Sequence, residues 1–189
     1  MLTRYRSAWG FTLIEMMISI AVLGILIGLS TPVYNTWIAN TQIRNQAESI
    51  QNGLRLAQTE AAKRNAQVDF VLTADDLSAD PTDASPTAST TGTSWVVRVA
   101  GATPTFIQGK SSREGSPDTS LACQGTCPTG FDGTVSFTGL GRTTLAGALQ
   151  MNVTSAQSGT RTLRVVVTTG GKVRMCDPAY SAGDPRACS

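Results

Sequence analysis

The stretch SAWGFTLIEMMISIAVLGILIGLSTPV, Ser7 to Val33, decides the fold of this chain. From Phe11 onward it is an almost unbroken apolar run, and a helix needs about 20 such residues to cross a bilayer. One carboxylate, Glu15, lies near its start, where an unpaired charge in hydrocarbon costs about 2.5–3.5 kcal/mol or more. The run therefore predicts a transmembrane helix over residues 11–33, and Glu15 requires a partner.

The residues before this run do not form an ordinary secretory signal. Arg4 and Arg6 precede the apolar residues, but no small-residue cleavage step follows them. Positive charge ahead of a membrane helix favours a cytoplasmic leader and a C-terminal domain on the other side.

At these residues the chain resembles the prepilin signature of type IV pilins and type II secretion pseudopilins. The resemblance rests on Gly10, Phe11, the Thr12–Ile14 segment and Glu15, followed by the apolar run. It implies that residues 1–10 are a leader, that a prepilin peptidase cuts between Gly10 and Phe11, and that Phe11 becomes N-methylated. It also implies that Glu15 pairs with the N-terminal amine of a neighbouring subunit, because a buried carboxylate is tolerated when paired. The alternative is a lone acid that reaches back to water at the membrane interface.

The helix is predicted to continue beyond the membrane half. Apolar residues spaced three and four apart form one stripe on residues 34–65, and Asn65 is a plausible stop. The stripe is expected to pack against a C-terminal sheet rather than in a coiled coil, because it is short and its residues are small. Its members are Ile43, Ala47, Ile50, Leu54, Ala57 and Ala61.

Residues 66–189 have the pattern of a β-rich domain with two long loops, 73–94 and 109–133. The fold class is therefore α+β, with a long N-terminal helix packed on an antiparallel sheet or a β-sandwich-like domain. The strand order also resembles the minor pilins FimT and FimU and the minor pseudopilin GspH, which implies the pilin fold. Strands are predicted over 68–72, 95–99, 105–108, 134–138, 149–153, 162–167 and 172–176.

Composition argues against catalysis and metal binding. The chain of 189 residues has no His, which removes the commonest general base and metal ligand. We expect no enzyme activity, no cofactor and no metal. The cysteines fall in two local pairs, Cys123/Cys127 and Cys176/Cys188. An even number of cysteines after a predicted membrane segment favours disulfides in an oxidising compartment. Local pairing is the simplest of three connectivities.

Charge is distributed unevenly along the chain. The segment 142–174 holds basic residues and no acid, whereas residues 66–135 are acidic. The sequence Gly171-Lys172-Val173-Arg174 resembles the G-R-x-R motif of DNA-binding FimT-like pilins, with Lys in place of the first Arg. On a strand, Lys172 and Arg174 share one face, and Arg161, Arg164 and Arg186 would widen a patch for double-stranded DNA. The alternative is ordinary solvent-facing cations that discourage edge pairing.

The resemblance implies a non-enzymatic minor pilin that acts in the assembly or initiation of a type IV pilus, with DNA capture for transformation as a further expectation. The alternative is a GspH-like minor pseudopilin of type II secretion. A membrane-tethered enzyme is the third, least favoured hypothesis. The expected partners are other pilin or pseudopilin subunits, the prepilin peptidase, the inner membrane and double-stranded DNA. The expected location is the inner membrane, single-pass, with the domain 66–189 in the periplasm.

Overall fold

The computed structural model describes residues 10–77, 80 and 82–188, apart from the side chains of residues 29–33. It divides the chain into two compact units, residues 1–35 and 36–189. The predicted leader 1–10 lies outside the described residues except for Gly10. One helix, α1 (Leu13–Arg64), contributes to both units.

In the first unit, α1 begins at Leu13. The backbone N–H of Glu15 donates a hydrogen bond of 3.3 Å to Thr12 Oγ1, so Thr12 caps the helix. Among the residues that the structure describes, no helix offers an apolar stretch long enough to cross a bilayer. The helix begins at Leu13, two residues after the first residue of the predicted span 11–33.

In the second unit, α1 buries the predicted stripe. All six residues of the stripe are fully buried: Ile43, Ala47, Ile50, Leu54, Ala57 and Ala61. The helix ends at Arg64, and Asn65 takes a positive φ of 48°, which Asn tolerates better than most residues. The N–H of Ala66 then donates to the carbonyl of Ala61 at 3.2 Å, which closes the helix end.

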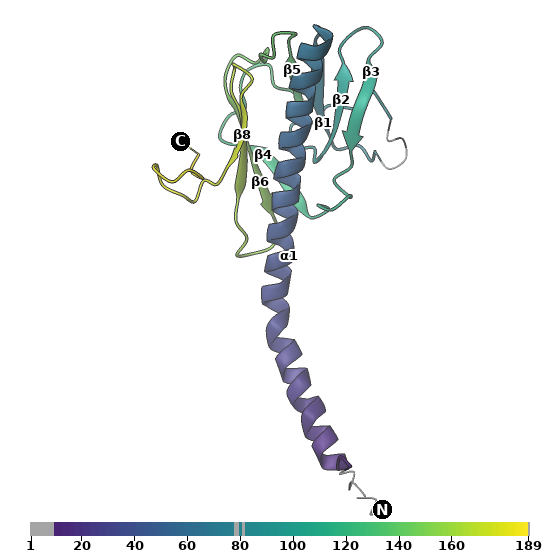
Figure 1. Ribbon diagram of the computed structural model, residues 1–189, viewed down its shortest axis with the longest axis vertical. Helices are drawn as coiled ribbons and strands as arrows, with labels where there is room; N and C mark the ends of the chain where they lie inside the picture. Colours follow the sequence, from purple (N-terminus) through teal and green to yellow (C-terminus); the bar gives the residue numbers. More distant parts are fainter. Residues whose placement is uncertain (1–9, 78–79, 81, 189) are drawn as a thin grey trace, which may run out of the picture. The chain divides into compact units, whose positions relative to one another are not determined.

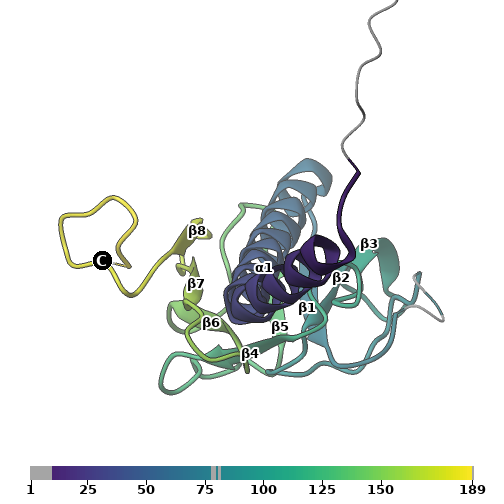
Figure 2. The ribbon, with the colours of Figure 1, turned by 90° about the horizontal axis from the view of Figure 1, so that it is seen from below.

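Two antiparallel sheets of four strands complete this unit (Figure 1). All seven predicted strands are present, with bounds shifted by at most a few residues. The first sheet has the order β3 (Thr105–Lys110), β2 (Ser94–Val99), β1 (Val68–Thr73), β5 (Thr134–Phe137). The second has the order β4 (Thr119–Cys123), β6 (Leu149–Ser155), β7 (Leu163–Val167), β8 (Val173–Cys176). Figure 2 shows the segment after β8 extending beside β7 and β8.

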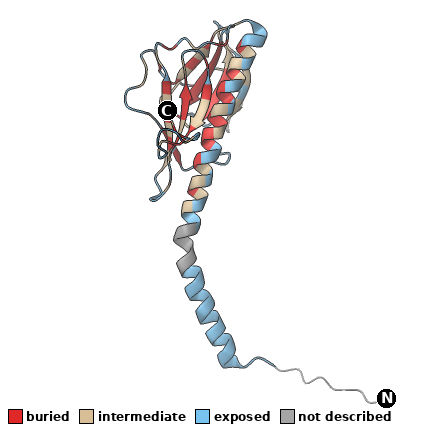
Figure 3. Ribbon diagram, turned by 60° about the vertical axis from the view of Figure 1, so that its left-hand side comes forward, coloured by how far each residue is buried: buried red, intermediate tan, exposed pale blue. Residues whose placement is uncertain are grey.

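A single cluster of buried side chains joins α1 to the inner faces of both sheets. Figure 3 shows the buried positions of the helix facing those of the strands. Phe70 and Trp95 stack with ring centroids 5.7 Å apart, directly against Gly53 of α1. A helix packed on antiparallel sheets confirms the predicted fold class.

One loop prediction was wrong, whereas the other segment, 73–94, is a loop between β1 and β2 that packs on the first sheet. Strand β4 lies inside the predicted loop 109–133 and pairs with β6; its buried and exposed residues alternate because one of its faces packs on the core. The described part of the predicted surface loop 73–94 folds over the first sheet. Leu77 is buried, Arg98 donates to the carbonyl of Ala84 at 2.8 Å, and the N–H of Ser89 donates to the carbonyl of Leu72 at 2.8 Å. Residues 78, 79 and 81 of this loop lie outside the described residues.

Candidate functional site

The predicted processing and docking residues lie at the start of α1. Gly10 and Phe11 precede the helix and are exposed, and Glu15 lies in its first turn, also exposed. A carboxylate in the first turn interacts favourably with the positive end of the helix dipole. Ser19 Oγ donates to the backbone carbonyl of Glu15 at 2.7 Å, one turn along the helix.

Glu15 is surrounded by exposed apolar side chains. Soluble proteins rarely expose a continuous apolar surface of this size, which marks a contact with lipid or protein. The charge therefore lies within a surface that something else must cover. Its large members are Phe11, Leu13, Ile14, Met16, Met17, Ile18, Ile20, Val22, Leu23, Ile25, Leu26 and Ile27.

The Gly171–Arg174 motif covers the end of the turn between β7 and β8 and the first two residues of β8. The N–H of Gly171 donates to the Thr168 carbonyl at 2.8 Å, and the N–H of Thr168 donates to the Lys172 carbonyl at 3.0 Å. Gly171 has a φ of 88°, and a Cβ atom there would collide with the Gly141 carbonyl. The glycine is thus required by packing. Lys172 is exposed just before β8, and Arg174 is half-buried within it.

Arg164 lies on the outer face of the second sheet, in a network of side-chain amides. Its Nε donates to Asn152 Oδ1 at 2.8 Å and its Nη2 to Gln124 Oε1 at 2.7 Å. Val166 pairs with Arg174 across the two strands, so Arg164, two residues before Val166, shares a face with Arg174. The structure brings Arg164 and Arg174 onto one face, next to the Lys172 turn.

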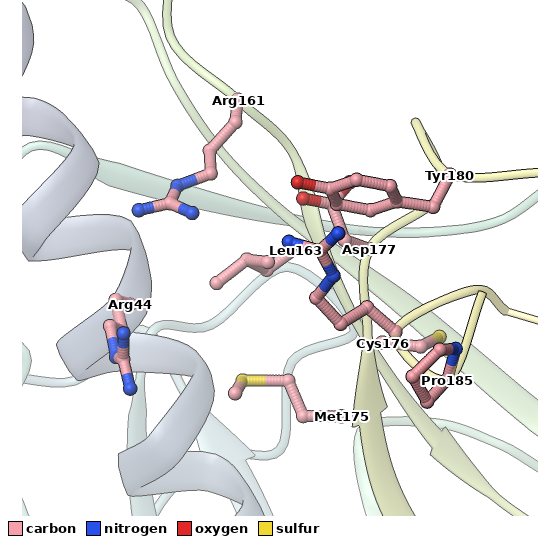
Figure 4. Close-up of a pocket in the computed structure, with 9 residues that line it drawn as sticks. Arg44, Arg161, Leu163, Met175, Cys176, Asp177, Tyr180 and Pro185 are labelled. Atoms are coloured by element: carbon pink, nitrogen blue, oxygen red, sulfur yellow. The ribbon is translucent and has the colours of Figure 1, made fainter.

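Arg161 lies elsewhere, in a groove of about 290 Å³ that we call the basic groove (Figure 4). α1, the start of β7, β8 and the disulfide-closed C-terminal segment all contribute to it. Leu163 and Met175 supply apolar surface, and Arg44 and Arg161 lie on the side of the groove next to α1, across from Tyr180 and Pro185 (Figure 4). The lining residues are Arg44, Arg161, Leu163, Met175, Cys176, Asp177, Tyr180, Pro185 and Arg186.

Local bonds hold the C-terminal wall of the groove. Cys176 is disulfide-bonded to Cys188, and the N–H of Asp177 donates to the Arg186 carbonyl at 2.8 Å. The Arg186 guanidinium lies 3.8 Å from the Tyr180 ring centroid and pairs with Asp184 at 2.9 Å. Hydrogen bonds from Arg186 lower the pKa of Asp184 below its usual value. The other pair, Cys123–Cys127, closes a short loop at the end of β4, so both disulfides join neighbours in sequence.

The charge of the groove rests chiefly on Arg161. Arg44 pairs with Glu48 at 2.7 Å, and Arg186 is paired as described above. Within the described part of the chain, no carboxylate lies within ion-pair distance of the Arg161 guanidinium. Arg44 and Tyr180 were missed from the sequence, because nothing local shows that residues so far apart along the chain meet.

Comparison with known proteins finds one family model and one motif model that match this chain. The Type II transport protein GspH family matches residues 46–171, and the prokaryotic N-terminal methylation motif matches residues 10–31. Type IV major fimbrial protein FimA of Dichelobacter nodosus is 47% identical over 47 residues, covering 25% of this chain and 29% of that protein. A fimbrial protein of Moraxella nonliquefaciens is 46% identical over 46 residues, covering 24% of this chain and 29% of that protein. The matches thus span less than a third of these relatives.

Among solved structures, the type IV minor pilin FimU of Pseudomonas aeruginosa strain PAO1 has a similar fold. The TM-score is 0.53 at 12% identity, over 78% of this chain and 95% of that chain. This similarity shows that the helix and sheets are arranged as in a pilin. The family match covers most of the chain beyond the apolar helix segment, and the methylation motif covers its start. The chain therefore belongs to the GspH family and carries the N-terminal methylation motif of pilins and pseudopilins.

Proposed function

We propose that this chain is a non-enzymatic minor pilin that acts in the assembly or initiation of a type IV pilus. One observation carries the proposal: Glu15 lies in the first turn of a helix with exposed apolar side chains, shortly after the Gly10–Phe11 step. A charge inside an apolar contact surface is unfavourable unless the contact supplies its partner. A filament of such subunits supplies that partner.

In this proposal, a prepilin peptidase cuts between Gly10 and Phe11, and Phe11 becomes N-methylated. The new amine carries a positive charge one helical turn from Glu15. When subunits pack, Glu15 of one subunit pairs with the Phe11 amine of its neighbour. A misplaced subunit leaves the carboxylate buried and unpaired, so the pair selects the correct position.

We also propose attachment to the inner membrane before assembly, with residues 66–189 in the periplasm. The methylation motif and the exposed apolar side chains of residues 13–28 support this location. The disulfides Cys123–Cys127 and Cys176–Cys188 agree with an oxidising compartment.

A second candidate function is that of a minor pseudopilin in type II secretion. The observation that favours it is the match of residues 46–171 to the Type II transport protein GspH family. Deleting the gene separates the two functions. Loss of piliation with intact secretion supports the pilin, whereas loss of exoprotein secretion with intact piliation supports the pseudopilin. Loss of neither would contradict both.

DNA capture is a further part of the proposal, supported by the placement of Lys172, Arg174 and Arg164 at one face of the second sheet. Phosphate contacts of this kind weaken with salt and ignore sequence. The full chain in detergent would be titrated into labelled duplex DNA at two salt concentrations, beside Lys172→Ala/Arg174→Ala. Lys63→Ala, on the last turn of α1, is the control. Salt-sensitive binding that only the double variant loses supports DNA capture, and absence of binding at low salt refutes it.

A further inference from the structure

The basic groove presents positive charge beside an apolar surface. Arg161 is exposed, and its backbone N–H donates to Asn40 Oδ1 at 2.9 Å, which fixes its position against α1. No carboxylate among the described residues lies within ion-pair distance of the Arg161 guanidinium. Leu163 and Met175 line the groove beside it and pack in the core. The groove therefore suits a ligand with both an anionic group and an apolar part.

Arg44 supplies a second cation on the side of the groove next to α1 (Figure 4). Its Nε donates to Glu48 Oε1 at 2.7 Å, and the Arg44 side chain is 61% exposed. An ion pair this exposed contributes little stability, so it competes only weakly with an incoming anion. Arg44 and Arg161 together match a phosphate group, because a guanidinium donates paired hydrogen bonds to phosphate oxygens.

The acidic residue of the groove lies away from these two arginines. Asp177 is buried, and its Oδ1 accepts the N–H of Ala179 at 2.9 Å. In Figure 4 it lies next to Tyr180, on the C-terminal wall. An anion therefore binds at the α1 side of the groove, where positive charge predominates.

The face of α1 that borders the groove also carries an exposed aromatic ring. Trp37 is 63% exposed; Asn40 follows it by three residues and Arg44 follows Asn40 by four, so all three share one helix face. The apolar run 11–33 ends four residues before Trp37. Trp is enriched where a membrane helix enters the lipid headgroup layer. Asn40, which holds Arg161, lies about 5 Å further along the helix, a distance within the thickness of that layer.

We propose that the basic groove binds the phosphate of an anionic phospholipid, with Arg161 and Arg44 on the phosphate and Leu163 and Met175 beside the glycerol and the first acyl carbons. This inference rests on the proposed attachment to the inner membrane. The groove lies on one side of the second unit, so the contact gives that unit one preferred orientation at the membrane surface. Arginines near an anionic surface attract it, and the attraction weakens as salt rises.

Titration of the full chain in neutral detergent with three ligands tests the groove, with bound ligand counted by native mass spectrometry. Dihexanoyl-phosphatidylglycerol is anionic, dihexanoyl-phosphatidylcholine has the same acyl chains without net charge, and glycerol 3-phosphate has the anion without the chains. We expect phosphatidylglycerol to bind about tenfold or more tightly than either of the others. Equal binding of the two lipids would overturn the proposal. Equal binding of glycerol 3-phosphate would also overturn it, because the ligand would then be a free phosphate ester.

Substitution of Arg161 provides the matched comparison. Arg161→Glu should raise the dissociation constant for phosphatidylglycerol about tenfold or more, since repulsion of the phosphate replaces attraction. Arg161→Lys keeps the charge but loses the paired hydrogen bonds, so its affinity should lie between the two. Arg142→Glu, at an exposed loop Arg outside the groove, is the control and should bind as the unsubstituted chain does. Unchanged affinity of Arg161→Glu, or an equal loss in Arg142→Glu, would overturn the proposal. Tighter binding of hexaglutamate than of phosphatidylglycerol would also overturn it, in favour of an acidic peptide.

Photolabelling locates the bound lipid on the chain. A phosphatidylglycerol with a diazirine near the glycerol should label peptides that contain Leu163 or Met175, less in Arg161→Glu but equally in Arg142→Glu. Labels confined to the apolar residues 13–28 would overturn the proposal.

Membrane fractionation of the unsubstituted chain tests the underlying location separately. If the chain is in the membrane fraction but Arg161→Glu binds lipid unchanged, this inference fails and the proposed attachment stands. Absence of the chain from the membrane fraction would overturn both.

Discussion

Trp95 Nε1 donates a hydrogen bond of 2.9 Å to Ser49 Oγ, and both residues are buried between α1 and the first sheet. The pair joins helix and strand β2 across 46 residues of sequence. It fixes the rotation of α1 on the sheet, because an indole N–H in the core must find an acceptor.

Ser49→Ala leaves that N–H buried without an acceptor. We expect the free energy of unfolding to fall by about 1–3 kcal/mol, the desolvation penalty of an unsatisfied polar group. Urea unfolding of the full chain in detergent, followed by circular dichroism, measures this. Thr59→Ala on the exposed face of α1 is the control. Equal stability of the two variants would show that the bond is unimportant.

Gly53 provides the space into which the first sheet packs. A Cβ atom there would lie 2.7 Å from Phe70 Cε2 and 3.1 Å from two atoms of the Trp95 ring. Helix propensity favours Ala by about 1 kcal/mol, but overpacking opposes it by about 1–3 kcal/mol. Gly53→Ala should therefore lower stability in the same unfolding measurement.

Gly24→Ala is the matched control, because a Cβ atom there meets nothing within 4 Å. It should be neutral or slightly stabilising. If both glycine variants gained stability alike, the close approach of Phe70 to α1 would be refuted.

The periodic parts of the fold were predictable from local sequence. The buried stripe from Ile43 to Ala61 was predictable because a helix repeats every 3.6 residues. The strands were predictable because side chains alternate between the two faces of a sheet. Strand β4 was missed because it is short and lies between turn residues, so its sequence alone resembles a loop. The packing of the loop 73–94 on the first sheet depends on distant partners such as Arg98 and Ala84.

The candidate sites also differ in how far the sequence alone could predict them. Gly10, Phe11 and Glu15 lie within six residues of each other, so the sequence alone predicts them as one motif. The basic groove combines Arg44 with residues more than a hundred positions later, and it depends on the register of β7 and β8. The sequence grouped Arg161 with Arg164, but the structure places Arg161 in the groove and Arg164 on the outer face of the sheet.

Gly10 is not required by side-chain packing, because a Cβ atom there meets nothing within 4 Å. If the prepilin peptidase recognises this glycine, Gly10→Val should block processing without changing stability. Intact-mass analysis of the chain from membranes should show retention of residues 1–10 and no added methyl group. Gly24→Ala should be processed normally. A cleaved and methylated Gly10→Val chain would refute the assigned cleavage site.

Glu60 accepts hydrogen bonds from Arg64 at 2.7 Å and from Lys63 at 3.2 Å, and these lower its pKa below 4.5. The pKa of Glu60 is therefore lower in the folded chain than in the unfolded chain. Ionised Glu60 stabilises the fold at pH values above its unfolded-state pKa, and this stabilisation is lost as the pH falls through its folded-state pKa. Arg64→Ala removes the hydrogen bond that lowers the pKa of Glu60 most, so this pKa should rise toward its ordinary value. A carboxyl NMR titration measures this, with Arg44→Ala as the control. An unchanged pKa in Arg64→Ala would contradict the assignment.

Docking through Glu15 is the central claim, and filament incorporation tests it most directly. The amount of this chain that copurifies with pili or pseudopili would be compared for the unsubstituted protein, Glu15→Gln and Glu48→Gln. Glu15→Gln keeps the size and removes the charge, so incorporation should fall about tenfold or more, as when one partner of a buried charge pair is removed. Glu48→Gln changes an exposed carboxylate on the same helix and should incorporate normally. Normal incorporation of Glu15→Gln would contradict the account.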